Sequence, residues 1–556
     1  MAEPPSPQKL LTRARVGVAH GALLAALFAV LVTALGNFDL LIPSWTPTLG
    51  RAAAVTLRTP YAPRIHTDGD RFRYEHARII VPRGTVLSEA NNDHRAVFAH
   101  ESLRRPGRPL RVAAEFAVNF GMGLALTAYL RRFGQNRVKL MRTQVGLFTI
   151  MLGVLALEKA LLLYTALPEG YVPVAAAPLW VALSFDRRTA FLVNVVLAFV
   201  AASLLRYDIL FLTLLLFRGM AASVLFFSVK RPQQMVTAGF FAGCSSVPLY
   251  VAVGVVLEGA FDVRGDLARG VDSTLLSCVG GGLLAGVLAN LLREPAARVL
   301  GHVSRDQLLW LTDLEQPLLQ KMASEAPGSW AHARAMANLA EAAASAIGAD
   351  ALLTRAGAYY HDLGKTLTPK HFIENLEHEE KSPHEALDPM ESAVIIRRHV
   401  TEGTRILREG GIPEPVVEFC YTHHGTQAVE YFFHKAKEQG NPHGYTEDDF
   451  RYPGMKPQTK ETAILMLVDS IEAASRTIDP PERAKYEQMI DRIIVTKLRA
   501  GQLDESGLSM EDLRSLAVRM GDTLVNVYHS RIKYPWQRGD RESALGRAAK
   551  PAARAK

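Results

Sequence analysis

Cysteine is scarce in this chain of 556 residues, which contains only three. Cys244, Cys278 and Cys420 lie far apart, none forms a CxxC pair, and two of them fall inside apolar runs. These features argue against a disulfide framework and against a zinc site built from thiolates. A nucleophile elbow of the serine-hydrolase type is also missing, so neither a cysteine nor a serine nucleophile is expected.

Charged side chains are missing from long stretches of the N-terminal half. Residues 16–36 contain no Lys, Arg, Asp or Glu, and about 20 apolar residues suffice for a helix to cross a bilayer. Lys9, Arg13 and Arg15 precede this stretch, as in a signal peptide, but the stretch is long for one and no clean A-x-A site follows it. We therefore interpret it as an uncleaved anchor. Further spans are expected at 112–130, 145–166, 171–185, 189–205, 208–229, 235–257 and 273–292, which gives eight in all.

The charges between these spans predict their orientation. With the N-terminus inside, the inside loops are all basic, as the positive-inside rule requires; they are residues 131–142, 186–188, 230–234 and 293–298. Residues 41–111 fall outside with twelve Arg against six Asp plus Glu, but the rule weakens for loops longer than about 60 residues. Everything after residue 293 is then cytoplasmic, and the protein is expected in the inner (plasma) membrane.

The basic inside loops and a basic tail account for the net charge of +8. This tail, residues 536–556, is expected to be disordered. No nucleic acid polymer is therefore expected as a partner. Inside the spans, Glu158, Lys159 and Arg218 are costly in lipid and should face protein or water. Either ordinary helix packing or the sensing of a ligand would account for them. The outer segment contains a short strand and turn around residues 71–90.

The composition changes near residue 302, after which charge rises and no apolar run reaches membrane length. Leucines at steps of three and four give residues 305–322 one apolar helical face, which predicts a linker helix within 301–325. The following residues, 326–535, show helical patterns and no sustained alternation. We predict an all-α protein, with an anchor in 1–40, an outer segment at 41–111, a seven-helix membrane region at 112–300 and then an all-α cytoplasmic domain.

Histidine is concentrated in this second half, where ten of the 17 lie between His332 and His443. Five of the ten lie in or at the ends of apolar helical patterns. Two neighbouring pairs occur among them, His361 with Asp362 and His423 with His424. Adjacent helical residues project about 100° apart, so each pair can address two ions. Imidazoles and carboxylates without thiolate suit Mn²⁺, Fe²⁺ or Zn²⁺ at two positions. The expected ligands are His332, His361, Asp362, His399, His423, His424 and Asp469.

The order H…HD…H…HH…D resembles that of the HD-domain phosphohydrolases. The segments "EAPGSWAHARAMANLAEAAA", "GAYYHDLGK", "FIEN", "HHGT", "YFFHKAKE", "DFRYPGMKPQTKE" and "GQLDESGLSMEDL" further resemble the seven-transmembrane HD proteins, the PgpH-type cyclic di-AMP phosphodiesterases. The resemblance is dense over about 302–535 and rests on architecture before that. The outer segment is much shorter than is usual in the family, which leaves its sensing role open.

This resemblance implies that the seven ligands hold two divalent ions, Mn²⁺ or Fe²⁺, with Asp362 bridging them. A hydroxide held between the ions would then open a phosphodiester of cyclic di-AMP and give pApA. Lys365 follows Asp362 by three positions and would either pair with it or reach a phosphate oxygen. The loop at 450–461 would steer the anionic substrate with Arg451, Lys456 and Lys460. The lipid bilayer is a further partner, and the sequence leaves homo-oligomer formation open.

Other functions fit the sequence less well. The HD-GYP phosphodiesterases for cyclic di-GMP carry HHE and a downstream GYP, whereas here the paired histidines continue as HHGT and Tyr445 is followed by Thr446. A (p)ppGpp hydrolase or a dNTP triphosphohydrolase would lack the family loops. A membrane receptor whose HD domain binds nucleotide and relays a signal would have a damaged ligand set, and all seven positions are intact.

Overall fold

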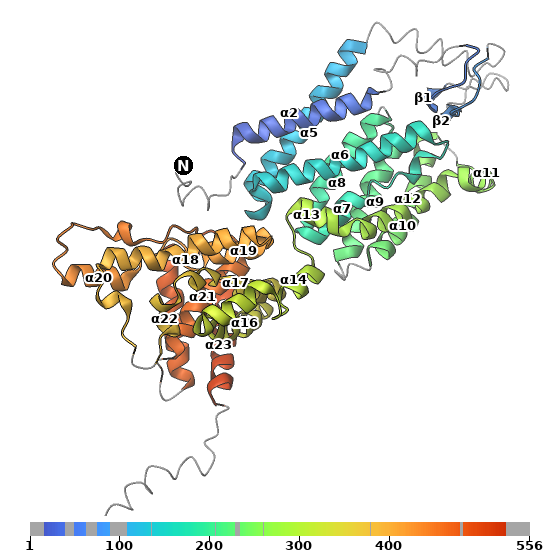
Figure 1. Cartoon of the computed structure of the whole chain (residues 1–556). Helices are drawn as coiled ribbons and strands as arrows, with labels where there is room; N and C mark the ends of the chain where they lie inside the picture. Colours follow the sequence, from blue (N-terminus) through green and yellow to red (C-terminus); the bar gives the residue numbers. More distant parts are fainter. Residues whose placement is uncertain are drawn as a thin grey trace, which may run out of the picture. The chain divides into compact units, whose positions relative to one another are not determined.

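The computed structural model describes residues 16–38, 49–62, 75–88, 108–134, 136–205, 207–227, 234–258, 261–377, 380–476, 478 and 482–529. The chain divides after Ser304 into two compact units, here called the N-terminal and C-terminal units (Figure 1). Both are helical, and the described strands form one two-stranded sheet. The all-α prediction is therefore confirmed. The basic tail, 536–556, lies outside the described residues.

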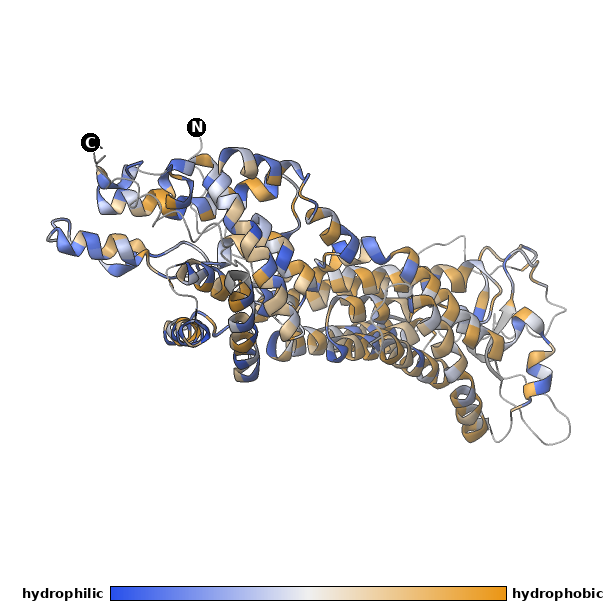
Figure 2. Cartoon of the chain, turned by 90° about the horizontal axis from the view of Figure 1, so that it is seen from below, coloured by the Kyte–Doolittle hydropathy of each residue, from blue (hydrophilic) through white to orange (hydrophobic). Residues whose placement is uncertain are grey.

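Seven helices of the N-terminal unit are long and apolar enough to cross a membrane within the described residues. Hydrophobic residues dominate them (Figure 2). They confirm seven of the eight expected spans and are α2 (Val18–Gly36), α5 (Arg108–Phe133), α6 (Met141–Tyr164), α8 (Arg187–Leu204), α9 (Ile209–Phe227), α10 (Met235–Glu258) and α12 (Thr274–Leu291). Two short helices, α11 (Val263–Leu267) and α13 (Arg293–Leu300), flank α12.

The span expected at 171–185 is wrong as a membrane-length helix. The structure has a 3-10 turn η3 (Glu169–Tyr171) and a nine-residue helix α7 (Ala176–Ser184), which is about 14 Å long, half of a bilayer core. Pro173 has no N–H to donate and cannot extend the helix backwards. Hydropathy predicted a span because the segment is apolar, although only residues 176–184 of it form an α-helix.

Arg218 stabilises the backbone that precedes α7. Its side chain is fully buried, and the guanidinium donates to the carbonyl oxygens of Gly170 and Val172, each at 2.7 Å. Carbonyl groups outside a helix are costly in an apolar interior unless a donor satisfies them. Gly281 of α12 allows the close approach, because a Cβ there would lie 1.9 Å from the Gly170 oxygen. Arg218 thus faces protein, as expected.

The segment made of η3, the residues after it and α7 lies along α12. Gly170 packs on Gly281, and Trp180 Nε1 donates to the carbonyl of Ala289 at 2.9 Å, so the segment follows α12 towards its C-terminus. It connects the end of α6 to the start of α8. Eight passages, which the charge pattern predicts, would require this segment to cross the membrane beside the seven helices, and that stays a prediction.

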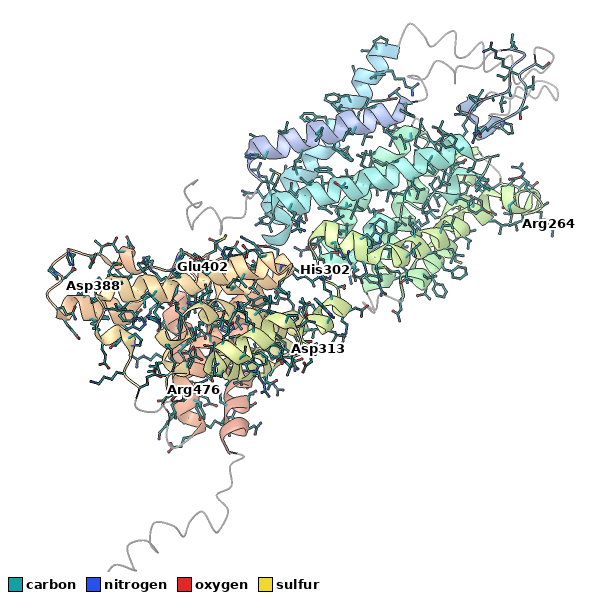
Figure 3. All side chains as sticks on the ribbon, viewed as in Figure 1. Arg264, His302, Asp313, Asp388, Glu402 and Arg476 are labelled. Carbon is teal, nitrogen blue, oxygen red and sulfur yellow. The ribbon has the colours of Figure 1, made fainter. Side chains whose placement is uncertain are left out.

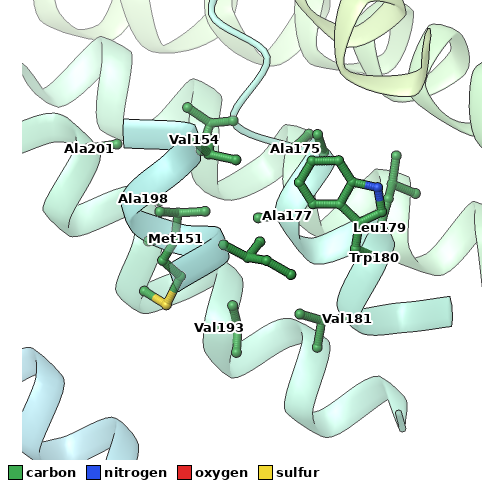
Figure 4. Close-up of a cluster of buried hydrophobic side chains, with 14 of the residues drawn as sticks. Met151, Val154, Ala175, Ala177, Leu179, Trp180, Val181, Val193, Ala198 and Ala201 are labelled. Atoms are coloured by element: carbon green, nitrogen blue, oxygen red, sulfur yellow. The ribbon is translucent and has the colours of Figure 1, made fainter. Parts of the chain in front are cut away.

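Small side chains allow the helices of the N-terminal unit to approach closely. The buried cluster of Figure 4 combines Trp180 and Met151 with alanines and valines from α6, α7 and α8. In a lipid environment, packing of this kind and not water exclusion holds helices together. Of the other charged residues predicted to face protein, Lys159 donates to the Gly36 carbonyl at 3.0 Å, and Glu158 is buried without a hydrogen bond.

The strands β1 (Leu57–Ala62) and β2 (Glu75–Val81) pair antiparallel, and β2 is the strand expected near residues 71–90. This sheet contacts the C-terminal end of α6. Arg58 donates to the carbonyls of Leu162, Thr165 and Leu167. The arginine therefore satisfies carbonyls that the end of a helix leaves without partners.

The C-terminal unit contains ten α-helices among the described residues, which are α14 (Arg305–Leu311), α15 (Pro317–Glu325), α16 (Pro327–Ala346), α17 (Ala351–Tyr360), α18 (Pro389–Glu409), α19 (Glu414–Thr422), α20 (Glu430–Glu438), α21 (Lys460–Ser475), α22 (Arg483–Arg499) and α23 (Met510–His529). Helix α21 is central, with residues 463–468 fully buried. The single linker helix expected over 305–322 is instead α14 and α15. The break follows from Pro317, which begins α15, and from Asp313, labelled in Figure 3, whose side chain accepts from the Glu315 N–H.

Candidate metal centre

Five helices bring the seven expected ligands together in the C-terminal unit. His332 comes from α16, His399 from α18 and Asp469 from α21. The ligand atoms form two groups, each within 4.8 Å: one of His332, His361 and Asp362, the other of His399, His423 and His424. Asp469 joins them, because its carboxylate lies 3.2 Å from His332 Nε2 and 4.0 Å from His424 Nδ1.

The two neighbouring pairs lie at helix ends, one of the two placements that the sequence pattern allowed. Helix α17 stops at Tyr360, so that His361 is its C-cap, and α19 stops at Thr422, so that His423 is its C-cap. Gly425 adopts a φ of +57°, which only glycine accepts readily, and this turns the chain after the second pair. Both members of each pair fall in the same group, and Asp362 of the first pair also approaches His399 and His423 of the other group.

Three histidines share one orientation. His361, His399 and His423 each place Nδ1 2.6–2.8 Å from a backbone carbonyl three residues earlier. A carbonyl only accepts, so each Nδ1 carries the proton and, in the neutral ring, each Nε2 is left with a bare lone pair. The Nε2 atoms point inward, where His361 Nε2 and Asp362 Oδ1 have no hydrogen-bond partner.

This arrangement is unfavourable without a cation. His399 Nε2 and His423 Nε2 lie 3.2 Å apart, and both are 3.6 Å from Asp362 Oδ1. Two bare nitrogens facing each other and a carboxylate repel, unless a positive ion lies between them. The donor set, imidazole and carboxylate without sulfur, matches divalent transition metals. The residues therefore fit the two-ion site that the sequence predicts.

Burial keeps His399, His423 and His424 neutral. It lowers the pKa of His399 to about 4 and that of His423 to about 3, and neutral imidazole is the form that binds metal. Burial and the neighbouring His423 also lower the pKa of His424 well below its usual value. These three ligands are thus ready to bind metal at neutral pH without first losing protons.

The same shifts predict that acid destabilises the metal-free protein. Below about pH 6.5 the unfolded chain protonates His399 and His423, whereas the folded chain does so only near their lowered pKa values, so stability falls as the pH drops from 6.5. Between pH 7 and pH 5 the loss should be about 2 kcal/mol for each histidine. His332, already protonated when folded, offsets less than about 1 kcal/mol.

The check is the unfolding temperature of the detergent-solubilised chain in EDTA at pH 7 and pH 5. The double variant His399→Gln, His423→Gln should lose most of the difference. Equal unfolding temperatures at the two pH values in the unmodified protein would contradict the assignment of these rings as buried and neutral.

His332 depends on a residue that the sequence did not single out. Its Nδ1 lies 2.8 Å from Glu472 Oε2, and Glu472 is itself bound by Arg476, labelled in Figure 3, at 2.7 Å. Burial alone would lower the pKa of His332, but the hydrogen bonds to Asp469 and Glu472 outweigh it and raise the pKa to about 10. A carboxylate behind a ligating histidine fixes the ring and raises its basicity. Glu472 follows Asp469 by three residues on α21, which is the only sequence signal for it.

Lys365 pairs with Asp362, the first of its two expected roles. Its ammonium lies 2.8 Å from Asp362 Oδ2 and 2.8 Å from Glu374 Oε1. Glu374 also accepts from the hydroxyl of Ser329 at 2.9 Å, at the start of the helix that carries His332. Lys365 therefore holds Asp362 in place and connects it to α16.

The three basic residues of the 450–461 loop all have acidic partners. Arg451 lies 2.6 Å from Asp448 and also pairs with Glu447; Lys456 lies 3.6 Å from Asp504, and Lys460 lies 2.7 Å from Asp512. The loop does reach the centre, through a tyrosine. The Tyr452 ring stacks on the His424 ring with 4.2 Å between centroids.

Two family models match the chain. Residues 110–293 match the "7TM receptor with intracellular HD hydrolase" model, and residues 330–474 match the HD domain. The curated "Cyclic-di-AMP phosphodiesterase PgpH" of Listeria monocytogenes is 30% identical over 514 residues, which cover 89% of this chain and 70% of that protein. This chain belongs to the PgpH family. The protein of the same name from Bacillus subtilis is 32% identical over 473 residues, 82% of this chain and 65% of its own length.

Among solved structures, the PgpH HD domain of L. monocytogenes is 42% identical, covers 39% of this chain and all of its own, and gives a TM-score of 0.37; the same values hold for that domain in complex with cyclic-di-AMP. The chain spans about two thirds of the length of its curated PgpH relatives. As a PgpH-family member with apolar spanning helices, it is a multi-pass membrane protein with an HD domain of the divalent metal-binding kind.

Proposed function

We propose that this chain is a membrane-bound, metal-dependent phosphodiesterase that hydrolyses cyclic di-AMP to pApA. The observation that carries the proposal is the complete set of seven donors, with bare imidazole nitrogens and a carboxylate oxygen converging in one buried centre. Both curated PgpH relatives are named for action on cyclic di-AMP. The proposed substrate therefore rests on family membership, and the proposed reaction rests on the set of metal-binding donors.

Each residue of the centre has its own role in the proposed reaction. His332, His361 and Asp362 would hold one divalent ion and His399, His423 and His424 the other, with Asp469 beside both groups. Mn²⁺ or Fe²⁺ would supply a hydroxide at neutral pH and neutralise charge on the phosphate. Asp362 lies between the groups, and Lys365 fixes its orientation. Glu472 keeps His332 turned towards the centre.

A receptor that only binds nucleotide is the second candidate, since one family model is described as a receptor. It requires no intact ligand set, whereas a hydrolase does. Incubating the full chain in detergent with Mn²⁺ and cyclic di-AMP separates the two, because a hydrolase gives a product that EDTA abolishes. Binding without any product would favour the receptor.

The C-terminal unit belongs in the cytoplasm under this proposal, where its nucleotide is found, and the protein in the plasma membrane. Eight passages put the N-terminus and the HD domain on one side, and the short basic loops put that side inside. A reporter active only in the cytoplasm should give signal when fused after residue 535 and none when inserted near residue 90. Signal from the residue-90 fusion would contradict the eight-passage topology.

A further inference from the structure

A cyclic dinucleotide carries two phosphates, and the metal-binding residues can address only one of them. Resting on the proposed function, this implies a cation elsewhere in the site for the second phosphate. The three cations expected from the loop at 450–461 all have carboxylate partners within 4 Å. Releasing any of them would leave a carboxylate without its partner, so they are poor candidates.

Lys497, near the C-terminal end of α22, differs from those three. Its ammonium donates to the side-chain oxygen of Gln427, a neutral partner, and the ion pairs of the described residues give it no carboxylate. Burial lowers its pKa, while the nearby Asp469 opposes this. An incoming phosphate oxygen can therefore replace the amide oxygen of Gln427 without breaking an ion pair.

Lys497 lies at the side of the metal centre that is most exposed to solvent. His424 and Asp469 are the most exposed of the seven donors, at 26% and 18%, whereas the other five are at most 10% exposed. Gln427 follows His424 by three residues, and its carbonyl accepts from the Tyr452 N–H at 2.8 Å. Lys497, Gln427 and Tyr452 thus border the side on which substrate must enter.

The framework around Lys497 is rigid. The buried side chain of Gln502 accepts from the Thr426 N–H at 3.1 Å and donates to the Thr426 hydroxyl at 3.1 Å. This fixes the turn that presents Gln427 and therefore fixes where the lysine lies. Because its neighbours already hold the lysine in place, binding of a phosphate there costs little conformational entropy.

We infer that Lys497 binds the phosphate of the cyclic dinucleotide that is not being cut. The lysine then contributes to binding and not to bond cleavage. Its loss should raise KM for a substrate with two phosphates and leave kcat nearly unchanged. A substrate with a single phosphodiester, which the metal-binding residues hold, should be unaffected.

The test compares cyclic di-AMP with bis(p-nitrophenyl) phosphate, using full-length protein in detergent with Mn²⁺. Lys497→Met should raise KM for cyclic di-AMP at least about tenfold, the scale of a hydrogen bond to a charged group, and change kcat/KM for bis(p-nitrophenyl) phosphate less than twofold. Lys497→Arg should recover part of the loss. The matched control is Lys485→Met, an exposed lysine on the same helix that pairs with Glu482 at 3.2 Å, and it should change neither substrate.

Metal content and unfolding temperature, measured alongside, should match the unmodified protein. Unchanged KM for cyclic di-AMP, or an equal loss on both substrates, would overturn the role of Lys497 and leave the phosphodiesterase standing. Should the unmodified protein cleave bis(p-nitrophenyl) phosphate but not cyclic di-AMP, the substrate assignment fails and the role of Lys497 falls with it.

Discussion

Replacing Asp362 with alanine is expected to remove bound metal and turnover together. The carboxylate is buried, lies 3.2 Å from His361 Nε2 and is 3.6 Å from the Nε2 atoms of two histidines in the other group. Asp362 and Asp469 both approach the two groups of imidazoles, and Asp362 is the more deeply buried of the two carboxylates. Since loss of a residue behind a metal ligand costs 10–100-fold, loss of this one should cost more than about a hundredfold in turnover.

The measurement is metal per chain by atomic spectroscopy, with turnover of cyclic di-AMP at saturating Mn²⁺. Asp362→Asn keeps the side-chain volume and removes the charge, so it separates the effect of lost packing from the effect of a lost metal ligand. Asp491→Ala, on the exposed surface of α22, is the matched control and should behave as the unmodified protein. Two ions per chain and an unmodified rate in Asp362→Ala would contradict the two-ion assignment.

Cyclic di-AMP should be cleaved at least about tenfold faster than cyclic di-GMP, compared as kcat/KM. A pocket built for adenine leaves polar atoms unpaired when it meets the exocyclic groups of guanine, at about 1–3 kcal/mol for each group, and about 1.4 kcal/mol is tenfold in rate. Parallel assays of the two dinucleotides at equal concentrations, with ppGpp as a third substrate, measure the preference. Equal rates, or faster cleavage of cyclic di-GMP or ppGpp, would refute the substrate and leave the metal centre intact.

The ligand set was predictable because its members have two independent marks in the sequence. Each of the five histidines lies in or beside an apolar helical pattern, and their order with the two aspartates is rare by chance. The exact local structure was not predictable in the same way. The pairs at 361–362 and 423–424 lie just beyond helix ends, where the first pair leads into the 3-10 helix η6 (Leu363–Leu367) and the second into the turn at Gly425.

The segment before α7 shows that hydropathy predicts burial but not whether the backbone is helical. Apolar composition predicts burial, but whether a buried backbone is helical depends on donors from elsewhere in the fold. Here the donor is Arg218, about 45 residues later in the chain, and only the tertiary structure brings it to Gly170 and Val172. Two features of the sequence speak against a membrane-length helix here, namely the short length of residues 171–185 and the prolines Pro173 and Pro178. By contrast, the break at Pro317 follows directly from the sequence.

Substrate-binding residues were the least predictable part of the site. Basic residues in a loop near the metal ligands suggested phosphate contacts, and this stays a prediction, although each of the three has a carboxylate partner. The partners of Lys456 and Lys460 are Asp504 and Asp512, about 50 residues away, and no spacing rule identifies them. Lys497 lies on a different helix from every metal ligand, so only the packing of α22 against α21 brings it to the centre.

The most direct test of the central claim is a time course of the full-length protein with cyclic di-AMP and Mn²⁺, with the products separated by chromatography. The account predicts that cyclic di-AMP disappears as linear pApA accumulates and that AMP appears more slowly, because pApA lacks the ring constraint and has one phosphate at its end. EDTA should stop the reaction. Unchanged cyclic di-AMP in the presence of protein that has bound two metal ions per chain would contradict the account.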